Sequence, residues 1–176
     1  MNRLSVLALW LPLVATTAIS ADTGPLAQAH AQLDAGNAAA ALHTLDVYLA
    51  TATTNPDARF LRGLALVRLN RSGEAIETFQ ALTHDFPKLP EPYNNLAVLY
   101  AQRGDLILAR DTLESALVVQ PEYAPAHENL GDVYAALAAK AYAQALSLAP
   151  GNPAVKYKLS LASQIGSNAG GTSAAH

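Results

Sequence analysis

The chain of 176 residues contains no cysteine. This absence excludes disulfide bonds, thiolate metal ligands, a catalytic cysteine and a lipid attached through a cysteine. Tryptophan and methionine occur once each, as Trp10 and Met1, so the rest of the chain has neither. Any packed core must therefore be built from other apolar residues.

Aromatic residues make up only 6% of the sequence and charged residues 14%, whereas hydrophobic residues make up 51%. The apolar content is therefore largely alanine and leucine, which is typical of a helical protein whose small side chains let helices approach closely. The formal net charge of −3 and the isoelectric point of about 5.9 are mild. The sequence lacks the basic footprint of a nucleic-acid-binding protein, so we expect no nucleic-acid partner.

Groups of residues that could carry catalysis are also missing. His127-Glu128 resembles the start of a zinc-binding helix, but no second histidine follows four residues later. His30 and His43 have neither a cysteine nor a carboxylate cluster beside them in the sequence. The sequence contains no phosphate-binding glycine loop and no serine-centred elbow. We therefore expect no enzymatic activity, no metal site and no cofactor.

Residues 1–21 have the pattern of a secretory signal peptide. Arg3 precedes an almost wholly apolar run, and small residues lead to a cleavage site after Ser20 or Ala21. The alternative is an uncleaved membrane anchor, but a span needs roughly 20 apolar residues. This run is shorter and contains Pro12. We expect a bacterial protein that is periplasmic or secreted and does not span the membrane after cleavage.

The most informative pattern in the sequence is a repeat in which equivalent residues recur with a constant 34-residue step. A fixed period in this range predicts a stack of similar supersecondary units, each too small to bury its apolar face alone. The step relates small residues, alanines, large apolar residues and prolines: Ala29, Gly63, Ala97 and Gly131; Ala41, Ala75 and Ala109; Leu45, Phe79 and Leu113; Gln32, Leu66, Tyr100 and Tyr134; Pro87 and Pro121.

Within one unit the apolar spacing predicts two helices. Tyr93, Leu96 and Tyr100 mark one helical face at spacings of three and four. Gly104 suits the left-handed end of a helix, and a second apolar helical pattern follows it. Pro121 then stops this second helix, because proline disfavours helix in the residue before it. Each unit is therefore predicted to be helix, turn, helix and loop.

These residues resemble the tetratricopeptide repeat (TPR). The resemblance covers roughly residues 26–150 and implies an all-α solenoid, with repeats at about 22–55, 56–89 and 90–123 and a shortened unit at 124–150. It also implies that the first helices of the repeats line a concave groove that binds a protein or peptide. The unit that carries the pattern most fully has Leu96, Ala97, Tyr100, Gly104, Ala109, Leu113, Ala116 and Pro121.

The fourth unit departs from the period. The step from Pro121 to Pro150 is 29 instead of 34, and the missing five fall between Tyr134 and Ala138. Residues 133–149 contain neither glycine nor proline and are rich in strong helix formers. We predict that the last helix pair is fused into one long helix over residues 125–149. The alternative is a tight turn near Ala138 and an ordinary hairpin.

A fused helix needs a cover for the apolar residues of its second half, namely Tyr142, Leu146 and Leu148. We expect residues 153–165 to form a capping helix and residues 166–176, which are rich in glycine, serine and alanine, to form a flexible tail. A second copy of the chain is the candidate cover for Tyr142, Leu146 and Leu148. Self-association as a homodimer through these three residues is therefore the alternative function.

The leading functional prediction is a non-catalytic scaffold of the bacterial envelope. The TPR resemblance implies recognition of a protein or peptide without paired lysines, since the sequence has no lysine before Lys88. Asn95 and Asn129 are one repeat apart, so we expect them to lie one above the other; the alternative is that they only satisfy nearby backbone groups. By register, the groove residues are His30, Leu33, Asp34, Phe60, Leu64, Val67, Arg68, Asn94, Asn95, Val98, Gln102, Glu128, Asn129 and Asp132.

Overall fold

The computed structural model describes residues 24–172, which form eight α-helices. The predicted signal peptide, residues 1–21, lies outside the described residues, as do residues 173–176. No helix within the described part is both long enough and apolar enough to cross a membrane. In chain order the helices are α1 (Pro25–Asp34), α2 (Ala38–Leu49), α3 (Pro56–Arg68), α4 (Ser72–Asp85), α5 (Pro90–Gln102), α6 (Leu106–Val119), α7 (Ala124–Leu148) and α8 (Pro153–Thr172).

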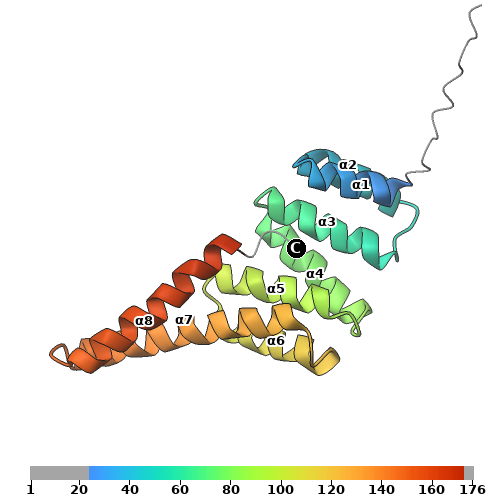
Figure 1. The fold of residues 1–176 in the computed structure, drawn as a ribbon. Coiled ribbons are helices and arrows are strands. Elements are labelled where there is room, and N and C mark those ends of the chain that lie inside the picture. Colours follow the sequence, from blue (N-terminus) through green and yellow to red (C-terminus); the bar gives the residue numbers. More distant parts are fainter. Residues whose placement is uncertain (1–23, 173–176) are drawn as a thin grey trace, which may run out of the picture.

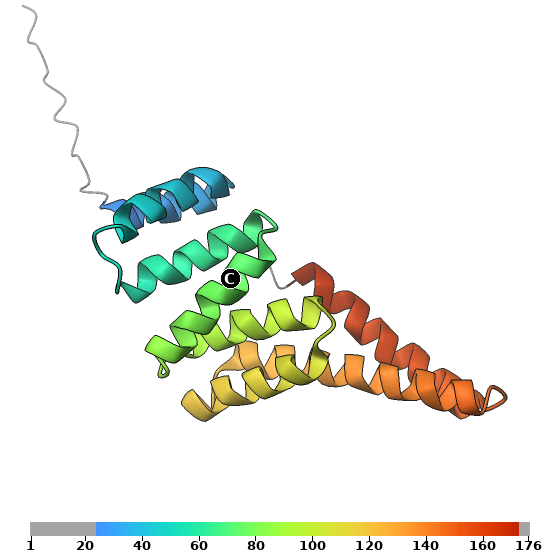
Figure 2. The ribbon, with the colours of Figure 1, turned by 180° about the vertical axis from the view of Figure 1, so that it is seen from behind.

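The helices form successive antiparallel pairs that stack side by side (Figure 1). Each helix packs against the next along the chain, and α1 also contacts α3 as α5 contacts α7. Figures 1 and 2 show the first helices α1, α3, α5 and α7 on one side of this stack and the second helices on the other. The predicted all-helical solenoid is confirmed.

The turn inside each of the first three pairs is built in the same way. Gly36, Asn70 and Gly104 have φ angles of 75°, 58° and 87°. In each turn the next amide reaches back five residues to a helical carbonyl, as Asp105 N does to Tyr100 O at 2.9 Å. These are Schellman ends, in which a left-handed residue satisfies the last carbonyls of a helix. The three turn residues follow the same step as the rest of the repeat.

The core of the stack consists of the predicted periodic residues. Ala41, Ala75 and Ala109 are completely buried, as are the large residues Leu45, Phe79 and Leu113. The requirement for a small residue in the first helix is clearest at Gly63. A Cβ atom there would lie 2.6 Å from the ring of Phe79, so the crossing of α3 and α4 leaves no room for one.

Helix α7 is continuous over 25 residues. Residues 135–138, which follow Tyr134 as the turn follows Tyr100 in the unit before, lie in the middle of this helix. Alanine is a strong helix former and disfavours the positive φ that the other turns use. Only Ala126 and Val133 are buried in α7, and its second half extends beyond α5 and α6 (Figure 1).

Helix α8 turns back and packs against α7, and among the described helices α7 is its only extensive contact. It begins at Pro153 and ends at Thr172, beyond the expected end at residue 165. The helix therefore includes residues 166–172, which were expected to belong to the tail. Once a helix is started, each added residue gains a backbone hydrogen bond, so the glycines here do not end it at once.

Candidate functional site

The candidate site is the surface formed by α3, α5 and α7 on the first-helix side of the stack. We call it the first-helix face and define it by the predicted residues of these three helices, from Phe60 to Asp132. The structure places these residues on three consecutive first helices, as the period requires. The residues of this face differ in the hydrogen bonds and packing contacts that their side chains already make within the chain.

On α3 the face is apolar and partly buried. The rings of Phe60 and Phe79 meet edge to face, with centroids 5.7 Å apart. Leu64 and Val67 pack partly buried against the core. Arg68 donates a hydrogen bond from Nη1 to the carbonyl oxygen of Leu33 at 2.6 Å, and so places its charge at the C-terminal end of α1. Arg68, which was predicted to lie in the groove, therefore joins α3 to α1.

On α5 and α7 the face is polar, and one side-chain pair joins the two helices. Asn129 Nδ2 donates to Asn94 Oδ1 at 2.8 Å. Asn95, which was expected to lie over Asn129, instead donates to the backbone oxygen of Glu91 in its own helix at 2.9 Å. The structure therefore pairs Asn129 with Asn94, because α5 and α7 present residues to each other with an offset of one from the sequence step.

Two carboxylates lie next to this amide pair. Glu128 is exposed and Asp132, one helical turn later, is half-buried, and neither forms an ion pair within residues 24–172. Burial raises the pKa of the Asp132 carboxyl, and the negative charge of Glu128 raises it further. Burial likewise raises the pKa of Tyr123, with a smaller contribution from Glu91. This end of the face therefore has uncompensated negative charge.

The other predicted positions are simpler. Val98 is half-buried, Gln102 is exposed at the end of α5, and His30 and Asp34 are exposed on α1. His127 contacts the carbonyl oxygen of Pro121 through Nε2 at 2.8 Å. Within residues 24–172 no three histidine, cysteine or acidic side chains gather in a way that could hold a metal ion.

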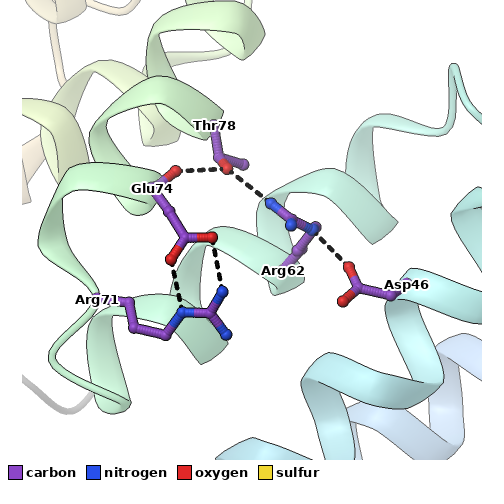
Figure 3. A network of polar contacts seen from close by, with 5 residues as sticks. All are labelled: Asp46, Arg62, Arg71, Glu74 and Thr78. Carbon is purple, nitrogen blue, oxygen red and sulfur yellow. Dashed lines mark hydrogen bonds and ion pairs between the residues drawn. The ribbon is translucent and has the colours of Figure 1, made fainter.

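One depression of the described surface is lined by none of the predicted residues of the first-helix face. An open depression of about 350 Å³ lies between α2, α3 and α4, and Arg59 and Arg62 are among its lining residues. Figure 3 shows the hydrogen bonds of this region: Arg62 donates to Asp46 at 2.7 Å and to Thr78 at 3.1 Å. Arg59 is held by Asp85 at 2.7 Å. Because both arginines already have partners in the chain, we assign this network to joining the three helices.

The residues proposed for self-association are largely covered. Tyr142 and Leu146 are half-buried on the second half of α7, where α8 packs, and Lys158 of α8 lies 5.9 Å from the centre of the Tyr142 ring. Leu148 is 79% exposed. Helix α8 therefore packs near two of these three residues and leaves Leu148 exposed.

Sequence reasoning missed two features of the surface. The Asn94–Asn129 pair depends on an offset of one residue between neighbouring helices, which the period of the sequence does not contain. The outer face of α8 exposes Tyr157, Leu161 and Ile165. Their spacing of four residues could have indicated this face. The helix was expected to end at residue 165, however, so Ile165 was its last residue.

Comparisons with known proteins agree with this architecture. A family model described as tetratricopeptide repeat matches residues 26–90. A crystal structure of a thermophilic TPR protein from Thermus thermophilus is similar, with 27% identity, a TM-score of 0.60 and coverage of 78% of this chain and 79% of that chain. The crystal structure of MamA is similar with 20% identity, a TM-score of 0.59 and coverage of 77% and 82%.

A third crystal structure is that of YrrB, described as a TPR protein with an unusual peptide-binding site. It is 24% identical, with a TM-score of 0.55 and coverage of 58% of this chain and 53% of that chain. None of the curated proteins compared with the chain matches it. Together the family model and the solved structures support the interpretation of this chain as a TPR repeat protein.

Proposed function

We propose that this chain is a non-catalytic scaffold that holds a protein or peptide segment against its first-helix face. Stacked helical repeats present extended surfaces that serve binding. The observation that carries the proposal is the amide pair of Asn94 and Asn129, which joins α5 and α7 into one polar surface at 2.8 Å. Each amide has two N–H donors and an acceptor oxygen, so one hydrogen bond leaves capacity for a peptide backbone.

The proposed mechanism is recognition without a covalent step. A bound segment would exchange hydrogen bonds with the free amide groups of α5 and α7. Its apolar side chains would lie on Phe60 and Val67 of α3, and a cationic side chain would lie beside Glu128 and Asp132. The similarity to YrrB is compatible with peptide recognition, but at 24% identity it supports the fold alone.

We further propose that the protein works in the bacterial envelope, which rests on the signal-like pattern of residues 1–21 and the absence of cysteine. In the same proposal α7 is a fused fourth helix pair and α8 is its capping helix. A loss of five residues between Tyr134 and Ala138 would remove the turn and its left-handed residue together. We do not favour self-association through Tyr142, Leu146 and Leu148, because α8 packs where the first two lie.

A selection of random phage-displayed peptides against the purified protein tests the function. Enriched peptides should bind the protein in solution, and the double variant Glu128→Ala with Asn129→Ala should weaken them about tenfold or more, the cost of losing roughly 1.4 kcal/mol of contacts. The matched control is Glu122→Ala with Gln144→Ala, which changes exposed residues outside the face. Equal affinity for both double variants would place peptide binding elsewhere and overturn the proposal.

A further inference from the structure

The outer face of α8 exposes three large apolar side chains. Tyr157, Leu161 and Ile165 are 65%, 43% and 51% exposed. A spacing of four residues places them along one side of the helix. Helix α8 packs on α7, and Leu159 and the buried Ala162 lie on a different side from this row. The exposed row is therefore apolar surface beyond what the α7–α8 contact uses.

The charge of this part of the molecule is of one sign. Asp132 is the last acidic residue of the sequence, and the charged residues of α8 and the second half of α7 are Lys140, Lys156 and Lys158. Two copies of α8 paired through their outer faces would bring lysines of both copies together. Like charges across an interface oppose association, so the partner of this face should be acidic.

The acidic surface with matching apolar residues lies on the same chain. Glu128 and Asp132 of the first-helix face, and Glu91 in the first turn of α5, form no ion pair within the described residues. On the same side of the stack α3 presents the partly buried Phe60 and Leu64. The half-buried Asp132 carboxyl, whose pKa is raised, would gain most from a cation nearby.

We propose that the outer face of α8 docks onto the first-helix face of a second copy of this chain. Tyr157, Leu161 and Ile165 meet the apolar surface of α3, while Lys158, at the edge of this row and beside Tyr142 of α7, approaches the carboxylates of α5 and α7. The chain's own α8 makes extensive contact with α7 alone, so it leaves this face to another copy. Because the two surfaces differ, the contact is head to tail and produces chains or a closed ring. The inference rests on the face assigned under the proposed function.

Light scattering of the purified protein over a range of concentration and salt gives the first test. The mean mass should rise above that of the monomer with concentration at low salt and fall as salt screens the charges. Leu161→Glu should weaken association about tenfold or more, as the loss of an interface anchor does. Ser163→Glu, an exposed residue on another side of α8, is the matched control and should associate as the parent does. A monomer at all concentrations and salts overturns the inference.

Mixing two defective variants gives the sharper test. The face variant Glu128→Lys with Asp132→Lys should be monomeric, whereas its control of equal charge, Glu77→Lys with Glu122→Lys, should still associate. Mixed with Leu161→Glu, the face variant should form a one-to-one dimer, because one partner keeps an intact α8 and the other an intact face. Circular dichroism checks that each variant is folded. Failure of the mixture to form this dimer, with both controls assembling, overturns head-to-tail docking.

The two proposals fail in different ways. If selected peptides bind and lose affinity in the face variants while the protein stays monomeric, self-docking is wrong and the proposed function stands. If the protein assembles as expected but no peptide is enriched, the self-docking inference stands and the proposed general peptide binding is wrong.

Discussion

The stack formed by α1 to α6 and the arm formed by α7 with α8 use related residues in different surroundings. In the stack, α5 buries six of its 13 residues. In α7 only two of 25 are buried, although it continues the same repeat pattern. A periodic residue thus becomes a core residue where neighbouring repeats pack on its helix from both sides, as α4, α6 and α7 do on α5. The period specifies which side of a helix is apolar, and the position in the stack decides whether that side is fully covered.

The largest expected effect comes from truncating the large residue of the second helix. Phe79 is completely buried, and Tyr142 stands in the corresponding place of the shortened unit but is half-buried. Phe79→Ala should lower the free energy of unfolding by about 3–5 kcal/mol, as large-to-small changes in a core do. Tyr142→Ala should cost about 1 kcal/mol, since a fully buried large side chain contributes roughly 1.5–3 kcal/mol. Urea denaturation measures both; equal losses would show that the arm is packed as tightly as the stack.

A smaller effect, with opposite signs in the two regions, is expected at the small residue of the first helix. A Cβ atom at Gly63 would lie 2.6 Å from the Phe79 ring, whereas one at Gly131 would meet nothing within 4 Å. Gly63→Ala should destabilise the protein by about 1–2 kcal/mol, because overpacking exceeds the gain in helix propensity.

Gly131→Ala should instead stabilise by up to about 1 kcal/mol, the propensity gain alone. The two variants share one chemistry and one repeat position, so each controls for the other in thermal and urea unfolding. A destabilising Gly131→Ala would mean that another element approaches α7 closely at this residue.

The stack was predictable because its determinants are local and repeated. The small residue at Gly63, the buried ring of Phe79 and the left-handed turn residues Gly36 and Gly104 each follow from a steric requirement that acts at one position. The continuity of α7 could be expected because residues 133–149 contain neither glycine nor proline. These features need only the sequence pattern and the geometry of a helix pair.

The details of the face and the arm were less accessible. Whether Asn129 meets Asn94 or Asn95 depends on how far α7 is shifted along α5, and the sequence period does not contain that shift. Arg68 was assigned to ligand binding, but it reaches the end of α1, a contact between residues 35 positions apart. Tertiary packing determines the partners of Asn129 and Arg68, because each of these two side chains bonds to a residue 35 positions away in the sequence.

The smallest expected effect concerns how the two regions hold negative charge. In the stack, hydrogen bonds from Arg71 at 2.6 Å lower the pKa of Glu74. At the start of the arm, burial raises the pKa of Asp132. A raised pKa means that the stability contributed by the protonated group is present below the ordinary aspartate value of about 3.9 and is lost as pH rises through the folded value.

Asp132→Asn removes that loss. The free energy of unfolding of the variant, relative to that of the parent, should therefore increase as pH rises from 3 to 7, by less than about 0.5 kcal/mol. Glu74→Gln should behave in the opposite way, since a lowered pKa gives stability that is present at neutral pH and lost in acid. It should therefore be less stable than the parent at pH 7 and approach it as pH falls. Urea unfolding at several pH values measures both differences. If the two variants changed with pH in the same direction, Asp132 would already have a cationic partner, and the negative charge of the first-helix face would not be open to a ligand.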